Sequence, residues 1–115
     1  MNVNPLILEL KNQTGMSGIP VVPDLYTGTA KTYVTFTYED ERPELFGNDK
    51  VLSDTAYMQI NLYNPASYNY MTLKDVIKTY LESIGIVTSV LSRVYNEQNE
   101  AVRQTTFTAT ITKER

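Results

Sequence analysis

Two residue types that carry much of protein chemistry are missing from this sequence of 115 residues, which has no cysteine and no histidine. Without cysteine, disulfides, thiolate nucleophiles and zinc–sulfur sites are excluded. Without histidine, the chain lacks the side chain that most often serves in acid–base catalysis and transition-metal binding near neutral pH. Both absences count against an enzyme, and they imply a domain that is stabilised by burial alone.

An excess of positive charge and long apolar runs are missing as well. Ten Lys and Arg against thirteen Asp and Glu give a formal net charge of −3, which does not favour strong binding to the phosphate backbone of nucleic acids. No apolar run approaches the ~20 residues needed to cross a bilayer. The opening stretch MNVNPLILEL has neither the basic start nor the longer apolar run of a secretory signal. We therefore expect a protein that stays in the cell that makes it.

Alternating apolar and polar residues predict the strands. The predicted strands are 32–38, 54–63, 86–95 and 101–112. In the last of them Phe107, Ala109 and Ile111 alternate with a row of threonines. The polar stretch NEQNE (96–100) is the turn before it. The charged segment EDERPELFGNDK (39–50), interrupted by Pro43 and Gly47, is predicted to be a long loop between the first two strands.

Two helices are predicted, one near the start and one in the middle of the chain. Residues 4–14 form the first, with Pro5 at its first position and Gly15 as its stop. The second runs from a capping box formed by Thr72 and Asp75 to Gly85, with apolar residues three and four apart. The stretch 15–24 between the first helix and the first strand is expected to be a turn and at best an edge strand.

These elements predict one α+β domain over residues 1–115, a twisted antiparallel sheet of about four strands with two helices packed on one face. The alternation places Tyr33, Tyr57 and Tyr63 on the opposite face, together with threonines. Such a face consists either of ordinary cross-strand pairs or of a contact surface for another protein. The sequence leaves both possibilities open.

No motif of the chain supports catalysis or metal binding. The acidic cluster between Glu39 and Asp49 does not have the spacing of a twelve-residue calcium loop, and Arg42 and Lys50 interrupt it. The stretch TGTAKT (27–32) has alanine where a phosphate-binding loop needs its second glycine. We therefore predict no catalytic residue, no cofactor and no metal ligand.

The order of elements resembles a known family of structural proteins. The stretch YVTFTYEDERPELFGNDKVLSDTAYMQINLYNPASYNYMTLKDVIKTYLESIGI combines a Tyr-Val-x-Phe strand, an acidic Gly-Asn-Asp segment, an alternating strand and a helix that ends before glycine. Two closing strands follow. Over about 19–112 the chain resembles the tail terminator, or tail completion, proteins that join head and tail in long-tailed bacteriophages.

This resemblance implies a virion protein without enzymatic activity. Such a protein is assembled in the bacterial host cytoplasm and forms a ring, expected to be a hexamer, on the head-proximal end of the tail. It ends polymerisation of the tail tube, contacts the tube protein, and presents a surface to the head connector or stopper protein. DNA would only pass through its lumen, and no membrane would be involved.

Partner or subunit contacts are assigned by expected exposure, since the resemblance supplies no contact motif. Phe46, a large apolar residue in a polar segment, is the expected anchor. Tyr68 and Tyr70 come second because they lie just before the second helix. The full set of predicted contact residues is Glu41, Arg42, Glu44, Leu45, Phe46, Asp49, Lys50, Tyr68 and Tyr70.

Besides an enzyme that uses the carboxylates of Glu44 and Asp49, which the missing histidine and cysteine disfavour, two other readings are compatible with the sequence. One is a different head–tail connector or a tube component of the same particle. The other is a small intracellular binding module of the inhibitor or immunity type, which an acidic sheet with a tyrosine face could serve.

Overall fold

The computed structural model describes the backbone of residues 4–46 and 50–114 and the side chains of residues 4–39 and 54–112. Its elements follow one another along the chain as two short helical turns, three strands, a longer helix and two final strands. They are α1 (Asn4–Leu8), the 3-10 helix η1 (Glu9–Asn12), β1 (Val21–Pro23), β2 (Tyr33–Phe46), β3 (Lys50–Pro65), α2 (Met71–Ile84), β4 (Ile86–Glu97) and β5 (Glu100–Glu114).

The α+β class is confirmed, and the sheet has five strands rather than about four. Their order is β1-β2-β3-β5-β4, with antiparallel neighbours throughout except for β1, which pairs parallel to β2. The expectation that residues 15–24 provide at best an edge strand is also confirmed, because β1 has three residues and lies at the edge. Its parallel direction arises because residues 24–32 carry the chain back before β2 begins.

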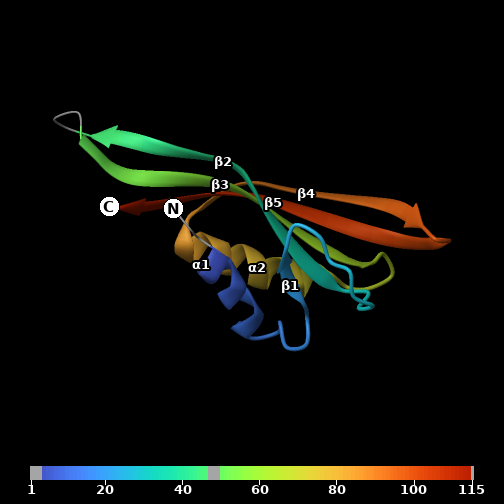
Figure 1. The fold of residues 1–115 in the computed structure, drawn as a ribbon. Helices are drawn as coiled ribbons and strands as arrows, with labels where there is room; N and C mark the ends of the chain where they lie inside the picture. The colour runs from blue at the N-terminus through green and yellow to red at the C-terminus, as the bar shows by residue number, and fades with distance from the viewer. Residues whose placement is uncertain (1–3, 47–49, 115) are drawn as a thin grey trace.

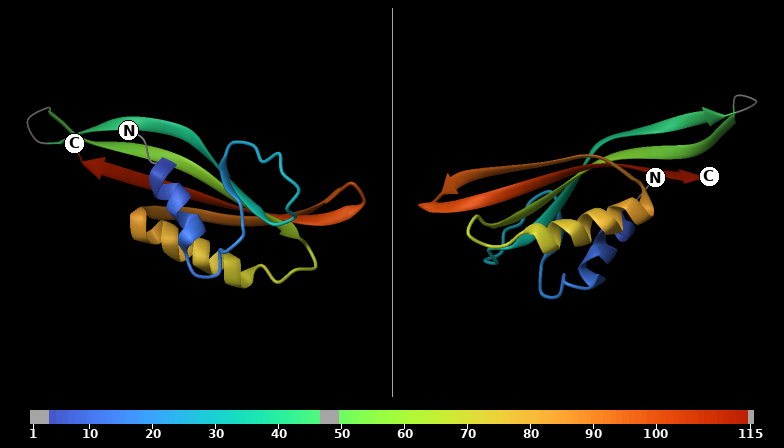
Figure 2. Two further views of the ribbon diagram at one scale, coloured as in Figure 1. Left: turned by 60° about the horizontal axis from the view of Figure 1, so that its bottom comes forward. Right: turned by 180° about the vertical axis from the view of Figure 1, so that it is seen from behind.

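Helices cover one face of the sheet and leave the other open (Figures 1 and 2). Helix α2 packs along that face, and α1 with η1 lies beside α2 on the same side. The first helical segment contributes the fully buried side chains of Ile7 and Leu10 to the core. The hydroxyl of Tyr80 in α2 donates a hydrogen bond to the carbonyl of Leu6, which fixes the two helical segments to each other.

The core is built from the strand positions that the alternation predicts. Phe36, Ile60 and Phe107 lie side by side on β2, β3 and β5, and each is at most 2% exposed. Leu73, Ile77 and Leu81 of α2 close over this face. These positions lie four residues apart, so a single stripe of the helix is buried.

The prediction of a loop at 39–50 is wrong. Strand β2 continues to Phe46 and β3 resumes at Lys50, so a long hairpin extends beyond the helix-covered part (Figure 1). Pro43 is tolerated because β1 pairs only as far as Phe36, so the described strands leave the outer side of β2 open there. Register shifts after Tyr38 and Glu44 also mark this strand as an irregular edge.

The start of α2 also differs from the prediction. Its N-cap is Tyr70, which makes no side-chain cap, and Asn69 Oδ1 accepts a hydrogen bond from the backbone N–H of Met71 instead. The capping box of Thr72 and Asp75 is therefore absent. The predicted end at Gly85 is confirmed, and a Cβ at this position would lie 2.4 Å from the carbonyl oxygen of Thr110. Glycine thus lets α2 turn directly into β4.

Candidate interaction surfaces

The predicted contact residues fall into two groups at opposite ends of the molecule. Those from Glu41 to Lys50 belong to the β2–β3 hairpin, whereas Tyr68 and Tyr70 lie near the start of α2 (Figure 1). Strand β3 spans the distance between the groups, from its pairing with the end of β2 to its pairing with the start of β5. The two groups therefore cannot form one contact patch on a single copy.

The hairpin group is placed by its backbone only. Glu41, Arg42, Glu44, Leu45 and Phe46 are in β2 and Lys50 is the first residue of β3, while Asp49 lies outside the described residues. The side chain of Phe46 is not among those that the structure describes, so its expected role as the anchor stays a prediction.

The two tyrosines before α2 have different environments. Tyr68 is 60% exposed and lines an open pocket of about 640 Å³ with Ser17 and Asn69. Tyr70 is half-buried, and the guanidinium carbon of Arg103 lies 4.3 Å from the centre of its ring. Tyr68 therefore remains available for a partner, whereas Tyr70 is occupied by a cation–π contact within the chain.

The open face of the sheet carries a continuous ladder of side-chain hydrogen bonds. It crosses four strands and consists of Glu39 (β2), Gln59 and Asn61 (β3), Gln104 and Thr106 (β5), and Arg93 (β4). The bond lengths lie between 2.8 and 3.3 Å. Asn61 is at the centre and is 5% exposed, although no helix covers this face.

Every bond along the main line of this ladder runs in the same direction. Arg93 donates to Gln104 Oε1, Gln104 donates to Asn61 Oδ1, and Asn61 donates to Gln59 Oε1. Gln59 then donates to the carboxylate of Glu39, and Thr106 adds a second donor to Asn61 Oδ1. A cation thus begins the line and an anion ends it, and each amide between them both donates and accepts.

Tyrosines form a stacked row beside the ladder. The rings of Tyr26 and Tyr63 lie on the two sides of Tyr33, with centroids 4.5 and 4.8 Å away. Burial raises the pKa of Tyr33 above its ordinary value, and the nearby Tyr63 raises it further. Burial and then Glu97 raise the pKa of Tyr95, over whose ring the Arg93 guanidinium lies at 5.2 Å. The hydroxyls of Tyr33 and Tyr95 therefore stay protonated well above neutral pH.

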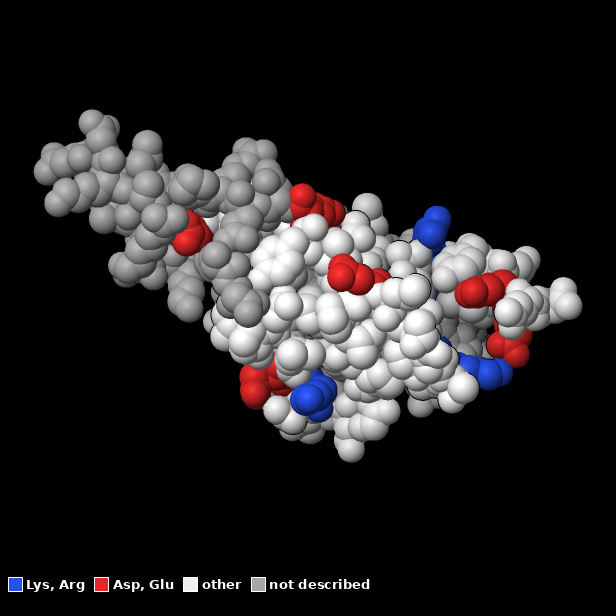
Figure 3. Space-filling model, viewed as in Figure 1, with Lys and Arg blue, Asp and Glu red and all other residues white. Residues whose placement is uncertain are grey.

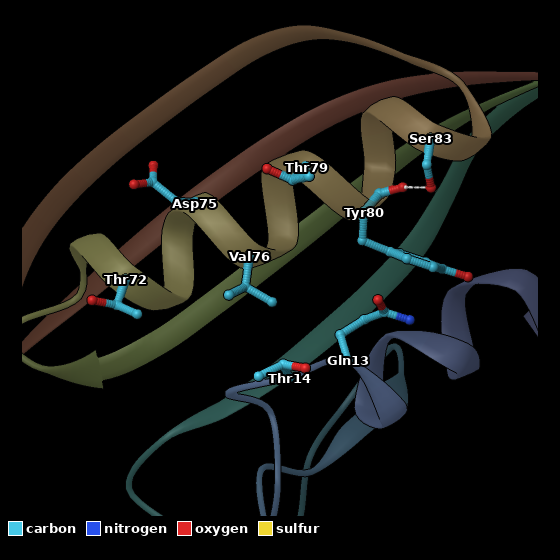
Figure 4. A pocket seen from close by; sticks show the side chains of 8 residues that line it. All are labelled: Gln13, Thr14, Thr72, Asp75, Val76, Thr79, Tyr80 and Ser83. Atoms are coloured by element: carbon cyan, nitrogen blue, oxygen red, sulfur yellow. Dashed lines mark hydrogen bonds between the residues drawn. The ribbon is translucent and has the colours of Figure 1, made fainter.

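A groove of about 510 Å³ lies between η1 and α2 on the helical side (Figure 4). Thr72 and Thr79 line it, and Asp75 extends away from Gln13 on the opposite wall. The hydroxyl of Ser83 donates to the carbonyl of Tyr80 in its own helix.

Charges are dispersed on the part of the surface that Figure 3 shows. In the view of Figure 3, acidic and basic side chains stand singly or in small groups among uncharged residues. Across the described part of the chain no group of three acidic residues could hold a metal ion. The described helices include none that is long and apolar enough to span a membrane.

Comparisons with known proteins show the fold and nothing more. No known family profile matches the chain, and no curated protein is similar to it in sequence. A solved structure of a protein without a functional name superposes with a TM-score of 0.53, covering 98% of this chain and 89% of the other. The two share 12% of their residues, so this likeness identifies the architecture alone.

The ladder and the tyrosine row are the features that the sequence left unresolved. The alternation correctly placed Tyr33 and Tyr63 on the open face, opposite α2. It also placed Gln59 and Asn61 there, but the partner of each amide depends on the register between strands. The available signal was the presence of three amide side chains on one predicted sheet face.

Proposed function

We propose that this protein is a structural subunit of a bacteriophage tail, which caps the tail tube as a ring, ends its polymerisation and provides the surface that joins the tail to the head connector. The observation that carries the proposal is the shape of the sheet. The molecule measures 57 × 26 × 24 Å, and its two long hairpins close at opposite ends of β3. The helices cover only its middle (Figure 1).

Two different ends are what a head-to-tail contact requires. One end is the β2–β3 hairpin, and the other combines the β4–β5 turn with residues 24–32, where Lys31 and Glu100 form an ion pair of 2.9 Å. When unlike surfaces of identical copies meet and the rotation closes, they form a ring. The position of the predicted contact residues at both ends is compatible with this arrangement.

The composition supports a role in which DNA passes without being held. The net charge of the chain is −3, and the polar groups of the ladder are bonded to one another. A surface with satisfied donors and few free cations offers little to a phosphate backbone. The expected partners are the tube protein on one side of the ring and the connector or stopper protein on the other.

The deciding experiment is the tail-length distribution, measured by electron microscopy, in a phage whose copy of this gene is silenced. We expect overlong tails of variable length, with normal length restored by the wild-type gene supplied in trans. Normal tails lying detached from full heads would instead indicate a connector, and loss of all tubes would indicate a tube subunit. Normal infectious particles would refute a role in the tail.

A variant tests the contact assignment within the same experiment. Tyr68→Ala removes a ring that is 60% exposed, so it should leave the fold intact and still reduce tail termination. Leu6→Ala, at a site that is 38% exposed in α1 and lies away from both ends, is the matched control. Equal termination by both variants would remove Tyr68 from the contact surface.

A further inference from the structure

The edges of the sheet differ in how well they are protected against pairing with another strand. An exposed edge offers unpaired N–H and C=O groups, and proteins protect such edges with short strands, proline, bulges and charges. The outer edge on one side consists of β1 and, beyond it, the distal part of β2. On the other side it is β4.

The β1 and β2 edge carries every one of these protections. Strand β1 has three residues and ends in Pro23. The part of β2 that extends past β1 contains Pro43, two register shifts, four acidic residues and one arginine. No strand can add there along a continuous line of backbone hydrogen bonds.

Strand β4 is almost unprotected by comparison. It has twelve residues, no proline and no lysine, and its only charges are Arg93 and Glu97 near its end. One register shift occurs, between Val87 and Ser89, close to its start. Beyond that shift β4 follows β5 without interruption to Glu97.

Apolar side chains line this open edge on both faces of the sheet. Leu91 is 70% exposed on the face of the ladder, where it neighbours Thr106, and Ile86 on the same face is 66% exposed. Val94, on the helical face, is 50% exposed. A strand added beside β4 would cover apolar surface on both faces at once.

We propose that β4 pairs with the β4 of a second copy in the free protein, antiparallel and about a two-fold axis. Two identical strands are self-complementary here, because with Leu91 opposite Leu91 each Arg93 lies opposite a Ser89 and no like charges meet. The pairing also ends at two copies. It uses the open edge of each molecule, and the protected β1 and β2 edges prevent the sheet from growing further.

This pairing gives the β4 edge a regulatory consequence, which rests on the proposed function. A two-fold pair has no front and back, whereas a ring between tube and connector must have both. Assembly of the ring would therefore require the pair to open, and the free protein would be kept from forming rings before a tail tip is present.

Single-cysteine variants test the pairing directly, because the chain has no cysteine of its own. In Leu91→Cys, oxidation of the purified protein should give a disulfide-linked dimer, which necessarily joins residue 91 of two copies. Leu25→Cys is the control for random collision, since Leu25 is as exposed, at 76%, and lies in the loop after β1. Equal cross-linking of both variants would overturn the proposal.

An edge-blocking substitution gives the second test. Leu91→Lys places a positive charge on each strand at the centre of the pair. We expect sedimentation to show that the dissociation constant of the dimer rises at least about tenfold. Leu25→Lys should leave the dimer unchanged, and circular dichroism should show both variants folded. A wild-type protein that sediments only as a monomer, or a dimer that survives Leu91→Lys, would refute the pairing. Neither result depends on tail length, so this proposal and the proposed function can fail separately.

Discussion

The two faces of the sheet are made by the same strands and stabilised in different ways. On the helical face, Phe36, Ile60 and Phe107 are buried by α2 and by each other. On the open face, Asn61 is almost as buried, and its neighbours there are polar side chains that bond to it. A sheet face without a covering layer can therefore still be ordered, provided that its polar groups satisfy one another.

The largest effect is expected on the helical face. Phe107→Ala should lower the free energy of unfolding by about 3–5 kcal/mol, because it removes a fully buried ring from the centre of the core. Urea denaturation measures this change. Thr108→Ala, at the next residue and on the open face, is the matched control and should cost less than ~1 kcal/mol. Should Phe107→Ala fail to fold, Phe107→Leu takes its place. Phe107→Leu should still lower the free energy of unfolding more than Thr108→Ala does.

Removing the centre of the ladder should have the next largest effect. Asn61→Ala leaves the donors of Gln104 and Thr106 without their acceptor, and we expect a loss of about 1–3 kcal/mol. A double-mutant cycle with Thr106→Val should show that the two losses are not additive. Strict additivity would mean that these bonds are not coupled and that the open face is an ordinary polar surface.

Alkaline pH should weaken the fold in part through Tyr33 on the open face. The pKa of Tyr33 is raised above 10.0 in the folded protein, chiefly by burial, so the folded state holds the phenolic proton more tightly than the unfolded state does. The stability from this neutral phenol is complete below pH 10 and is lost as the pH rises through the folded-state pKa. Tyr33→Phe should reduce this alkaline loss, measured by urea denaturation as a function of pH. An unchanged pH dependence would contradict the assignment.

The ends of the ladder should contribute least. Arg93 and Glu39 are exposed, so Arg93→Gln and Glu39→Gln should each change the free energy of unfolding by less than ~1 kcal/mol. Added salt should reduce the difference from wild type further. A cost at either end as large as that of Asn61→Ala would show that the terminal charges, rather than the central amide, stabilise this face.

The division into two faces could be predicted from the sequence because it depends on a local period. Alternation at 54–63 and 101–112 correctly separated Ile60 and Phe107 from Asn61 and Thr106. The stripe that ends before Gly85 likewise identified α2. Alternation and helical spacing are patterns of residues close together in the chain, so they can be recognised without knowing the fold.

What could not be predicted depends on distant partners. Charges and Pro43 in the segment 39–50 indicated a loop, yet pairing with β3 keeps it extended, and an edge strand tolerates proline. The parallel pairing of β1 and the bonds of the ladder depend on register. The contact residues of the hairpin, together with Tyr68 and Tyr70, were chosen by expected exposure. Tyr70 proved to be half-buried, with Arg103 over its ring.

The shared direction of the ladder bonds has a consequence for how the open face responds to change. No amide in the line can reverse alone, because a reversed Asn61 would point a donor at the donor of Gln104 and an acceptor at the acceptor of Gln59. The line therefore has two orientations, and the cation at Arg93 and the anion at Glu39 select one of them. Replacing either terminal charge would therefore weaken the preference for one orientation along the whole line, which ends three strands away from where it begins.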